Sequence, residues 1–402
     1  MQGIIPVKDK IYWIGTNDHE TDLFEAIWPL PRGVSYNSYI IVDSKVALID
    51  TVKSSYLTPY LEKIKTLLGP EKKVDYLVVN HMEPDHSGSI RDIRRLYPEM
   101  KIVGNKKTAE FIRDFYQIQE GVISVSEGAS LDLGTCRLKF FLTPMVHWPE
   151  TMVSFEETQK VLFSCDAFGG FGALDDRIFD DEVDLAFYED EILRYFANIV
   201  GRYSNMVQRA IKKLGGLDIA VVAPSHGPVW RDRPGEIIEL YDKWSRHETE
   251  PGVVLVYASM YGNTRRMMEE ISRSLAEEKI EKVRVHDISR THISFVLVDI
   301  WRFRGMILGA PTYNTRLFPL MESLVCMLEE KMLRDRFIGI FGSYSWSKGA
   351  VKRLADFAEK SNLTLVEPVV EFKCSPTEED MNQAAQLGKN LSEMVSKNVK
   401  GE

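Results

Sequence analysis

The chain has few cysteines, no long apolar run and no excess of positive charge, and each absence excludes a class of protein. Its four cysteines, at positions 136, 165, 326 and 374 of 402 residues, show no CxxC spacing. This argues against a zinc ribbon or a rubredoxin-type iron site and predicts reduced thiols in the core. No apolar stretch reaches the length that crosses a bilayer. The formal net charge of −9 disfavours nucleic acid as a partner, because phosphate contacts need clustered Lys and Arg.

The start of the chain, MQGIIPVKDK, lacks the basic and then apolar layout of a secretory signal. We therefore expect a cytoplasmic protein with no membrane partner. At 402 residues the chain is too long for one ordinary compact domain, so two domains are the natural expectation.

Short apolar strands dominate the first half of the chain. The segments KIYWIG, VSYNSYIIVD and KVALIDT are typical of strands bounded by turn residues. Helical patterns are fewer, near 55–68 and over about 183–214. Two series of strands with helices outside them predict stacked sheets covered by helices, an αββα sandwich.

The pattern changes after SRHETEPG, residues 245–252, a polar stretch that ends in Pro251 and Gly252 and is typical of a linker. From there, five predicted strands are each followed by a predicted helix. This alternation predicts a doubly wound, five-stranded parallel sheet. We therefore expect two α/β domains, residues 1–250 and 251–402.

Potential metal ligands follow several apolar strands of the first half. Four of them stand in the segment HMEPDH and three more follow later strands, giving the set His81, Glu83, Asp85, His86, His147, Asp166 and His226. Strand ends at one edge of a sandwich lie close in space, so we expect these side chains to converge. Any one of them alone is more simply a hydrogen-bonded strand end or a helix cap. The whole set predicts a metal site. The remaining histidines stand in polar settings and are expected at the surface: His19, His247, His286 and His292.

The ligand types leave two chemistries open. A pair of metals with nitrogen and oxygen ligands suits reduction of a small diatomic molecule, and without redox chemistry it suits hydrolysis of an ester, thioester or phosphoester. The pattern resembles the HxHxDH loop of the metallo-β-lactamase superfamily, with Glu83 in place of the second histidine. A carboxylate there makes the site harder and more anionic, which moves its preference from zinc toward iron.

The second half carries three loops at the ends of predicted strands. The segment SMYGNTRRM, residues 259–267, opens onto a helix, so its hydroxyl and backbone N–H groups suit a phosphate at the positive end of the helix dipole. It is neither a Walker loop nor a GxGxxG motif, and it is similar to the phosphate loop of flavodoxins, which bind FMN. The segments GAPTYNTRLFP (309–319) and GSYSWSKG (342–349) follow the third and fourth strands, where ring-binding loops lie. A serine-rich turn with a helix cap explains the first loop alone, but not all three.

The resemblance to flavodoxins implies FMN contacts from all three loops, with Trp346 covering one face of the isoalloxazine ring. The residues implied are Ser259, Met260, Tyr261, Gly262, Asn263, Thr264, Pro311, Thr312, Tyr313, Asn314, Ser343, Tyr344, Ser345, Trp346 and Gly349.

Together the two halves resemble the flavodiiron proteins, a family of cytoplasmic oxygen and nitric oxide reductases, over essentially residues 1–402. The motifs HMEPDHSGS, VHWPETMVS, LFSCDAFG, PSHGPVW, SMYGNTRRM and GSYSWS carry this resemblance. It implies a metallo-β-lactamase-like diiron domain followed by a flavodoxin-like domain. It also implies an oxidoreductase that passes electrons from an external donor through FMN to two non-haem irons and reduces O2 to water, NO to N2O, or both.

The resemblance also implies a ligand for each iron. One iron is expected on His81, Glu83 and His147, the other on Asp85, His86 and His226, with Asp166 as the bridge. His86 either binds the iron directly or contacts a ligand without binding the iron.

The same resemblance implies a head-to-tail homodimer or a dimer of dimers, in which the flavin of one subunit faces the metals of the other. The electron donor is expected to be a separate molecule, rubredoxin or a reduced deazaflavin. One alternative is a binuclear metallohydrolase with a docking flavodoxin domain, against which Glu83 and the flavin loops count. The other is an electron carrier without metals, against which the intact His81 and Asp166 count.

The aromatic stretch FEAIWPLPRGVSYNSY, residues 24–39, has two possible roles. It either covers the metal pocket as a lid, or forms a strand hairpin with Trp28, Tyr36 and Tyr39 in the core.

Overall fold

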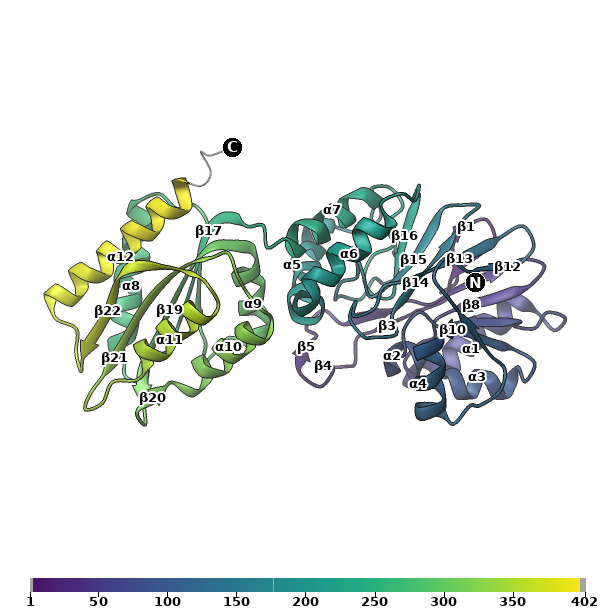
Figure 1. The fold of residues 1–402 in the computed structure, drawn as a ribbon, viewed down its shortest axis with the longest axis horizontal. Coiled ribbons are helices and arrows are strands. Elements are labelled where there is room, and N and C mark those ends of the chain that lie inside the picture. The colour runs from purple at the N-terminus through teal and green to yellow at the C-terminus, as the bar shows by residue number, and fades with distance from the viewer. Residues whose placement is uncertain (1–2, 176, 398–402) are drawn as a thin grey trace. The chain divides into compact units, whose positions relative to one another are not determined.

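The computed structural model describes residues 3–175 and 177–397. The chain divides into two compact units, one ending at Ser245 and the other beginning at Arg246 (Figure 1). The domain limits 1–250 and 251–402 stay predictions. The first strand of the second unit, β17, begins at Glu250.

Two β-sheets form the centre of the first unit. The larger has the strand order β1-β2-β7-β8-β9-β10-β11, with bounds Ile5–Lys8, Ile11–Trp13, Tyr39–Val42, Val46–Ile49, Tyr76–Val78, Lys101–Asn105 and Val122–Val125. The smaller has the order β12-β13-β14-β15-β16, with bounds Ser130–Asp132, Arg137–Leu142, Met152–Glu156, Val161–Cys165 and Val221–Pro224. Strands β14 and β15 are buried at every position, because both faces of their sheet are covered.

Helices cover the outer face of each sheet (Figure 1). Beside the larger sheet lie α1 (Leu57–Leu68), α3 (Ile90–Leu96) and α4 (Lys106–Tyr116). Beside the smaller sheet lie α5 (Leu185–Tyr195), α6 (Ser204–Leu214) and α7 (Pro234–Ser245). The predicted αββα sandwich is confirmed. The single helical stretch predicted over 183–214 is α5 and α6, joined by a π-helical turn, Phe196–Val200, and a 3-10 turn, Gly201–Tyr203.

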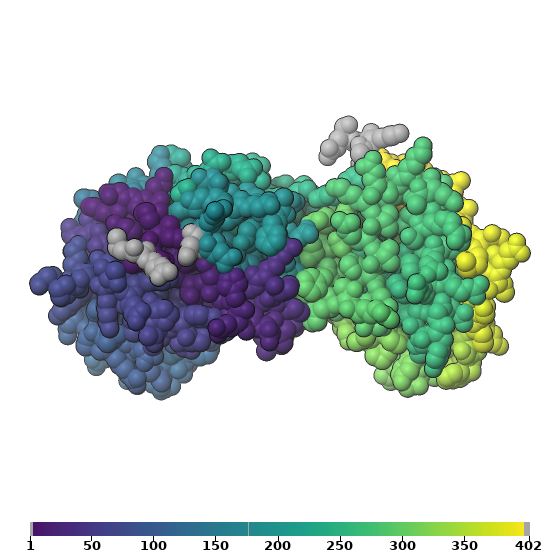
Figure 2. Space-filling view, turned by 180° about the vertical axis from the view of Figure 1, so that it is seen from behind, coloured from purple at the N-terminus to yellow at the C-terminus, as the bar shows by residue number. Residues whose placement is uncertain are grey.

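The aromatic stretch 24–39 contributes to two small antiparallel sheets, of which one, β4–β5, is a hairpin. Strand β4 (Leu23–Phe24) pairs with β5 (Trp28–Pro29), and β6 (Val34–Tyr36) pairs with β3 (Thr16–Asp18). The side chains of Trp28, Tyr36 and Tyr39 are buried, as the hairpin interpretation predicted. Figure 2 shows purple segments of the first unit beside teal ones, and within this unit the Arg32 guanidinium is 3.8 Å from the centroid of the Phe187 ring on α5.

The second unit is a five-stranded parallel sheet in the order β18-β17-β19-β21-β22. The strands are β17 (Glu250–Tyr257), β18 (Val283–Asp287), β19 (Phe303–Tyr313), β21 (Phe337–Tyr344) and β22 (Thr364–Lys373), and a short β20 (Arg316–Leu317) pairs antiparallel with β19. Its helices are α8 (Asn263–Glu277), α9 (Ile293–Arg302), α10 (Pro319–Glu330), α11 (Ala350–Lys360) and α12 (Glu378–Lys397). Helices α8 and α12 pack together on one face of the sheet, and the others lie on the opposite face (Figure 1). The predicted doubly wound, flavodoxin-like sheet is confirmed.

Two expectations about individual residues are wrong. Cys326 and Cys374 are exposed, since one lies on the outer face of α10 and the other directly follows β22. His247 is buried, with its ring centroid 5.1 Å from that of Trp301. Burial and the nearby Arg336 lower the pKa of His247 to about 3. Among the described residues, no helix is both long and apolar enough to cross a lipid bilayer.

Candidate functional site

The seven predicted metal ligands converge at one edge of the first unit, as the strand-end argument predicted. The loop after β9 and the short helix α2 (Pro84–Ser87) supply four of them, His81, Glu83, Asp85 and His86. The other three follow strands of the smaller sheet: His147 after β13, Asp166 after β15 and His226 after β16. The two sheets of the sandwich therefore meet at this site.

One cluster gathers around Oδ2 of Asp166. The Nε2 atoms of His81 and His147 lie 3.3 and 3.2 Å from that oxygen. They also lie 3.3 and 3.1 Å from Oε2 of Glu83. Two imidazoles and two carboxylates thus face one point.

A second cluster gathers around the other oxygen of the same carboxylate. The Nε2 atoms of His86 and His226 lie 3.2 and 3.6 Å from Oδ1 of Asp166, and 3.3 and 3.4 Å from Oδ2 of Asp85. The two Nε2 atoms are 3.0 Å apart. Asp166 therefore stands between two sets of donors, with one oxygen toward each.

These distances and contacts fit two metal ions. Two ligand atoms that each lie about 2.1 Å from one metal are roughly 3.0 to 3.4 Å apart in octahedral or tetrahedral geometry. Both carboxylate oxygens of Asp85 and of Asp166, and Nε2 of His147, are buried without a well-aligned hydrogen bond. Buried polar atoms are normally satisfied, so these atoms have the chemistry of a ligand set that fits cations.

The outer nitrogens of two imidazoles are anchored to the protein. Nδ1 of His81 lies 2.7 Å from Oε1 of Glu150, and Nδ1 of His226 lies 2.7 Å from the carbonyl oxygen of Ser35. Donation of the Nδ1 proton to these outer acceptors would leave each Nε2 lone pair for a metal. Such outer partners fix the tautomer and the orientation of metal-binding histidines.

Asp50, at the carboxyl end of β8, anchors the backbone of the loop that carries His81. Its Oδ1 accepts hydrogen bonds from the backbone N–H of Asn80 at 2.7 Å and of His81 at 3.4 Å, and its Oδ2 accepts one from the Asn80 amide at 3.2 Å. Complete burial raises the pKa of Asp50 to about 6, although these hydrogen bonds and the nearby histidines oppose the rise.

The electrostatics of the cluster follow from many opposite charges in a buried site. Burial would raise the pKa of Asp166, but attraction from His86 and His81 lowers it well below its usual 3.8. Burial would lower the pKa of His86 and His147, but the surrounding carboxylates, Asp166 among them, raise both to about 9. Asp166 is thus ionised and can offset the charge of cations.

A cavity of 420 Å³ leads to the cluster, and Glu83 and Asp85 line its inner side. Its outer wall includes Phe24 and Glu25 from the β4–β5 hairpin. The ring of Phe24 packs 5.3 Å from that of His226. The stretch 24–39 therefore also borders this cavity, and its role as a lid stays a prediction.

Sequence reasoning missed several residues that support the site, Ser35, Asn37, Asp50 and Glu150. The side-chain amide of Asn37 donates to the carbonyls of Pro224 and Gly227, both at 2.9 Å, on either side of His226. Of these four residues, only Glu150 has a sequence feature that connects it to the metal site, because it stands close to His147 in the segment VHWPE.

The predicted flavin loops gather at the carboxyl ends of β17, β19 and β21 in the second unit. Ser259, Met260, Tyr261 and Gly262 lie between β17 and α8, which begins with Asn263 and Thr264. Pro311, Thr312 and Tyr313 end β19, and Asn314 follows it. Ser343 and Tyr344 end β21, whereas Ser345, Trp346 and Gly349 lie between it and α11. Thr264 Oγ1 lies 3.2 Å from Ser343 Oγ, so the first and third loops touch.

The first loop has the geometry of an anion cradle. Gly262 has φ +96° and is the N-cap residue of α8. Oγ of Ser259 accepts hydrogen bonds from the N–H groups of Gly262 at 3.1 Å and Arg265 at 3.3 Å, so this hydroxyl lies at the start of the helix. A positive φ of this kind favours glycine. The free N–H groups of a helix start and its dipole attract a phosphate. Around this cradle, Tyr261 is 93% exposed and Trp346 is 81% exposed. Large exposed aromatic side chains of this kind indicate a site for a flat apolar group, so the residues fit FMN.

Comparison with known families and proteins agrees with this geometry. Residues 34–227 match the model of the ODP family beta lactamase, and residues 255–388 match the flavodoxin model. The chain is 31% identical to a nitric oxide reductase of Moorella thermoacetica, over 98% of this chain and 99% of the relative. It is 34% identical to the anaerobic nitric oxide reductase flavorubredoxin of Escherichia coli O1:K1, over 87% of this chain and 74% of the relative.

Two solved structures are similar over nearly the whole chain. The rubredoxin oxygen:oxidoreductase from Desulfovibrio gigas has a TM-score of 0.94 at 27% identity, over 98% of this chain and 99% of that chain. The flavodiiron protein from Giardia intestinalis has a TM-score of 0.93 at 27% identity, over 98% and 97% of the two chains.

Proposed function

This chain belongs to the flavodiiron protein family of oxidoreductases, and we propose that it passes electrons from an external donor through FMN to a non-haem diiron site that reduces O2 to water, NO to N2O, or both. The flavodoxin domain implies FMN, and flavodiiron relatives carry a diiron site. When bound, the two irons supply Lewis acidity and two electrons, and reduced FMN supplies two more.

The arrangement of Asp166 carries the proposal. Its two oxygens face two separate groups of imidazole nitrogens and carboxylate oxygens, which is the arrangement of a bridging ligand. We propose that one iron binds His81, Glu83 and His147, and that the other binds Asp85, His86 and His226. The 3.2 Å separation of His86 Nε2 from Asp166 Oδ1 supports His86 as a direct ligand.

The residues of the chain have three tasks in this proposal. The three carboxylates of the clusters, Glu83, Asp85 and Asp166, offset the charge of the metals. Glu150 and the carbonyl of Ser35 hold Nδ1 protons, so that His81 and His226 present only lone pairs to the metals. The cavity beside Glu83 and Asp85 gives a small diatomic molecule access to the centre.

The proposed flavin set is the three loops at the ends of β17, β19 and β21. The first loop would hold the phosphate, and Trp346 would cover the ring. Donor, oligomeric state and location stay predictions: rubredoxin or a reduced deazaflavin as donor, a head-to-tail homodimer or dimer of dimers, and the cytoplasm.

The test is anaerobic turnover of the purified, photoreduced protein with O2 and with NO, with iron and FMN measured in the same sample. We expect about two irons and one FMN per chain and fast oxidation by at least one gas. Zinc in place of iron, with slow flavin oxidation and peroxide release, would overturn the proposal and favour a binuclear hydrolase. The ratio of the two rates measures the preference between O2 and NO.

A further inference from the structure

Three buried asparagines of the first unit reach from the larger sheet to the smaller one at the edge that carries the metal ligands. Asn37 lies between β6 and β7, Asn80 follows β9, and Asn105 ends β10. The Asn37 amide donates to carbonyls on both sides of His226, and the Asn105 amide donates to the carbonyl of Glu150. Side-chain amides therefore join the two sheets where the site is built.

Asn80, the residue before His81, has contacts on both sides. Its backbone N–H donates to Oδ1 of Asp50 at 2.7 Å, and its side-chain amide donates to Oδ2 at 3.2 Å. On the other side, its Oδ1 accepts a hydrogen bond from Oγ of Ser154 at 2.6 Å, and its carbonyl accepts one from the N–H of Met152 at 3.0 Å. Asp50 follows β8 of the larger sheet, whereas Ser154 and Met152 belong to β14 of the smaller sheet. The start of the ligand loop is therefore held to both sheets.

Ser154 is a polar residue in an aromatic setting. Its direct partners across the sheet are Phe140 on β13 and Phe163 on β15, both buried, and directly opposed side chains point to the same face. Ser154 itself is completely buried. A hydroxyl between two phenyl rings costs free energy unless it has a hydrogen-bond partner. Its contact with Asn80 supplies that partner, and a satisfied buried polar pair specifies one arrangement of the groups that it joins.

The contacts between the two groups of ligands depend on this arrangement. One group follows β9 of the larger sheet, and the other follows strands of the smaller sheet. Nε2 of His81 lies 3.3 Å from Oδ2 of Asp166, and Nε2 of His147 lies 3.1 Å from Oε2 of Glu83, so both distances span the two groups. Metal–ligand distances tolerate deviations of only about 0.2 Å. A small displacement of the loop after β9 would therefore change how the site holds a metal.

We infer that Asn80 and Ser154 are positioning residues that fix the loop after β9 against the smaller sheet and thereby set the spacing of the two groups of metal ligands. This inference rests on the proposed function, because it assumes a metal pair at this site. Neither residue belongs to the ligand set, and both act through the backbone that leads into His81. Loss of the Ser154 hydroxyl should let the loop move away from β14, weaken metal binding and alter the surroundings of the metals.

The test uses the full chain with iron and FMN bound and compares Ser154→Ala, Asn80→Ala and the double variant with the wild type. Competition with a chelator measures iron affinity, and electron paramagnetic resonance of the half-reduced centre reports the ligand environment of the irons. We expect iron affinity to fall about tenfold in Ser154→Ala, at the lower end of the effect of outer partners, together with a changed resonance spectrum. If Ser154 acts through Asn80, the double variant should bind iron no more weakly than Asn80→Ala alone, because losses at residues in contact are not additive.

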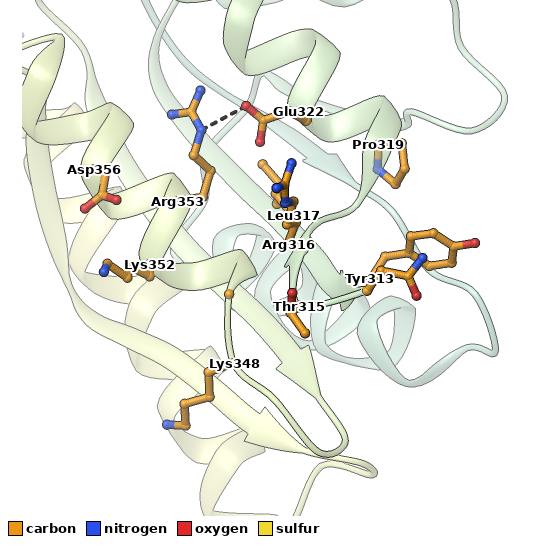
Figure 3. Close-up of a pocket in the computed structure, with 12 residues that line it drawn as sticks. Tyr313, Thr315, Arg316, Leu317, Pro319, Glu322, Lys348, Lys352, Arg353 and Asp356 are labelled. Atoms are coloured by element: carbon orange, nitrogen blue, oxygen red, sulfur yellow. Dashed lines mark hydrogen bonds and ion pairs between the residues drawn. The ribbon is translucent and has the colours of Figure 1, made fainter.

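Two controls remove polar contacts elsewhere. Ser204→Ala takes away a buried hydroxyl of the same unit that donates to the carbonyl of Gly201 at 2.7 Å. Glu322→Gln weakens the contact of 2.9 Å between Oε1 of Glu322 and Nε of Arg353, beside a cavity of the second unit (Figure 3). Both should leave iron affinity within about twofold of the wild type and the spectrum unchanged, because residues without a shared partner act independently.

Several results would overturn the inference. One is a chelator curve and a spectrum of Ser154→Ala equal to those of the wild type, and another is an equal loss of iron affinity in Ser204→Ala. Additive losses in the double variant would show that Ser154 does not act through Asn80. Should Ser154→Ala fail to fold, Ser154→Cys takes its place, because a thiol is only a weak donor, and an iron affinity equal to that of the wild type would then contradict the inference. Zinc in place of iron in the wild type would count against the proposed function instead, and chelator competition for zinc would still test the positioning of the ligands.

Discussion

Nδ1 of His81 lies 2.7 Å from Oε1 of Glu150, and both side chains are completely buried. The same oxygen accepts a hydrogen bond from the backbone N–H of Met82 at 2.9 Å. We expect Glu150→Gln to weaken iron binding about 10- to 100-fold, as loss of such outer partners does. Competition with a chelator measures this change. The exposed Glu157→Gln is the control, and identical chelator curves for the two variants would contradict the role given to Glu150.

We propose that Glu83 sets the preference of the site for iron over zinc. Its Oε2 lies 3.3 Å from Nε2 of His81 and 3.1 Å from Nε2 of His147. We expect Glu83→His to raise the zinc-to-iron ratio about tenfold, because an imidazole makes the ligand set softer and less anionic. Metal analysis after reconstitution with equal amounts of both ions measures the ratio. Glu83→Asp keeps the carboxylate and should keep the preference for iron, and an unchanged ratio in the histidine variant would refute the argument.

The positions of the predicted ligands could be inferred from sequence because strand ends meet at one edge of a sheet. Each predicted ligand lies shortly after the end of an apolar strand. The local pattern of residues and the strand topology are therefore sufficient to predict that these side chains meet. Glu150 could not be assigned in this way. An acidic residue in a loop is ordinarily exposed, and its contact with His81 joins residues 69 positions apart.

The fold class was predictable from alternation of strands and helices, whereas individual exposures were not. His247 stands in a polar segment, yet it is buried against Trp301. Cys326 is an apolar type on a helix, yet it faces outward. In both cases tertiary packing decides the exposure, and no local pattern reports it.

The iron-free protein should lose stability as pH rises. In the folded state the pKa values of His86 and His147 are raised to about 9 from 6.5. The folded state therefore binds these protons more tightly, so the stabilisation is complete below about pH 6.5 and is lost as pH rises through about 9. Thermal unfolding at pH 6.5 and 9.5 tests this, with a lower Tm expected at pH 9.5.

Iron binding and substitution of one histidine provide the controls for this pH dependence. Bound iron takes the place of the protons, so we expect a smaller decrease in the iron-loaded protein. The substitution His86→Asn should also make the fall in Tm between pH 6.5 and 9.5 smaller. A Tm that rises with pH in the iron-free protein would contradict the assignment.

Gly309 on β19 lies directly against the ring of Phe341 on β21, which is completely buried. A Cβ at position 309 would overlap this ring. We expect Gly309→Ala to destabilise the second unit by about 1 to 3 kcal/mol, the usual effect of overpacking a core. Urea unfolding followed by flavin fluorescence measures it. Lys389→Ala, at an exposed position of α12 in the same unit, should change stability by less than about 0.5 kcal/mol. Equal effects of the two substitutions would rule out the packing argument.

Thr264 should contact the phosphate of FMN and not its ring. The side chain is buried in the first turn of α8, and its hydroxyl lies 3.2 Å from that of Ser343. Thr264→Val keeps the shape and removes the hydroxyl. A hydrogen bond to a charged group contributes about 1.5 to 3 kcal/mol, so we expect FMN affinity to fall about 10- to 100-fold. Quenching of flavin fluorescence on binding measures the Kd.

Riboflavin, which lacks the phosphate, separates the two possible contacts of Thr264. If the hydroxyl binds the phosphate, Thr264→Val should leave riboflavin affinity within about twofold of the wild type, because no charged partner is lost. The control Thr364→Val, at an exposed position of β22, should alter neither affinity. An equal loss of affinity for FMN and riboflavin would mean that Thr264 supports the ring. The phosphate would then depend on the backbone N–H groups of the loop and on the start of α8.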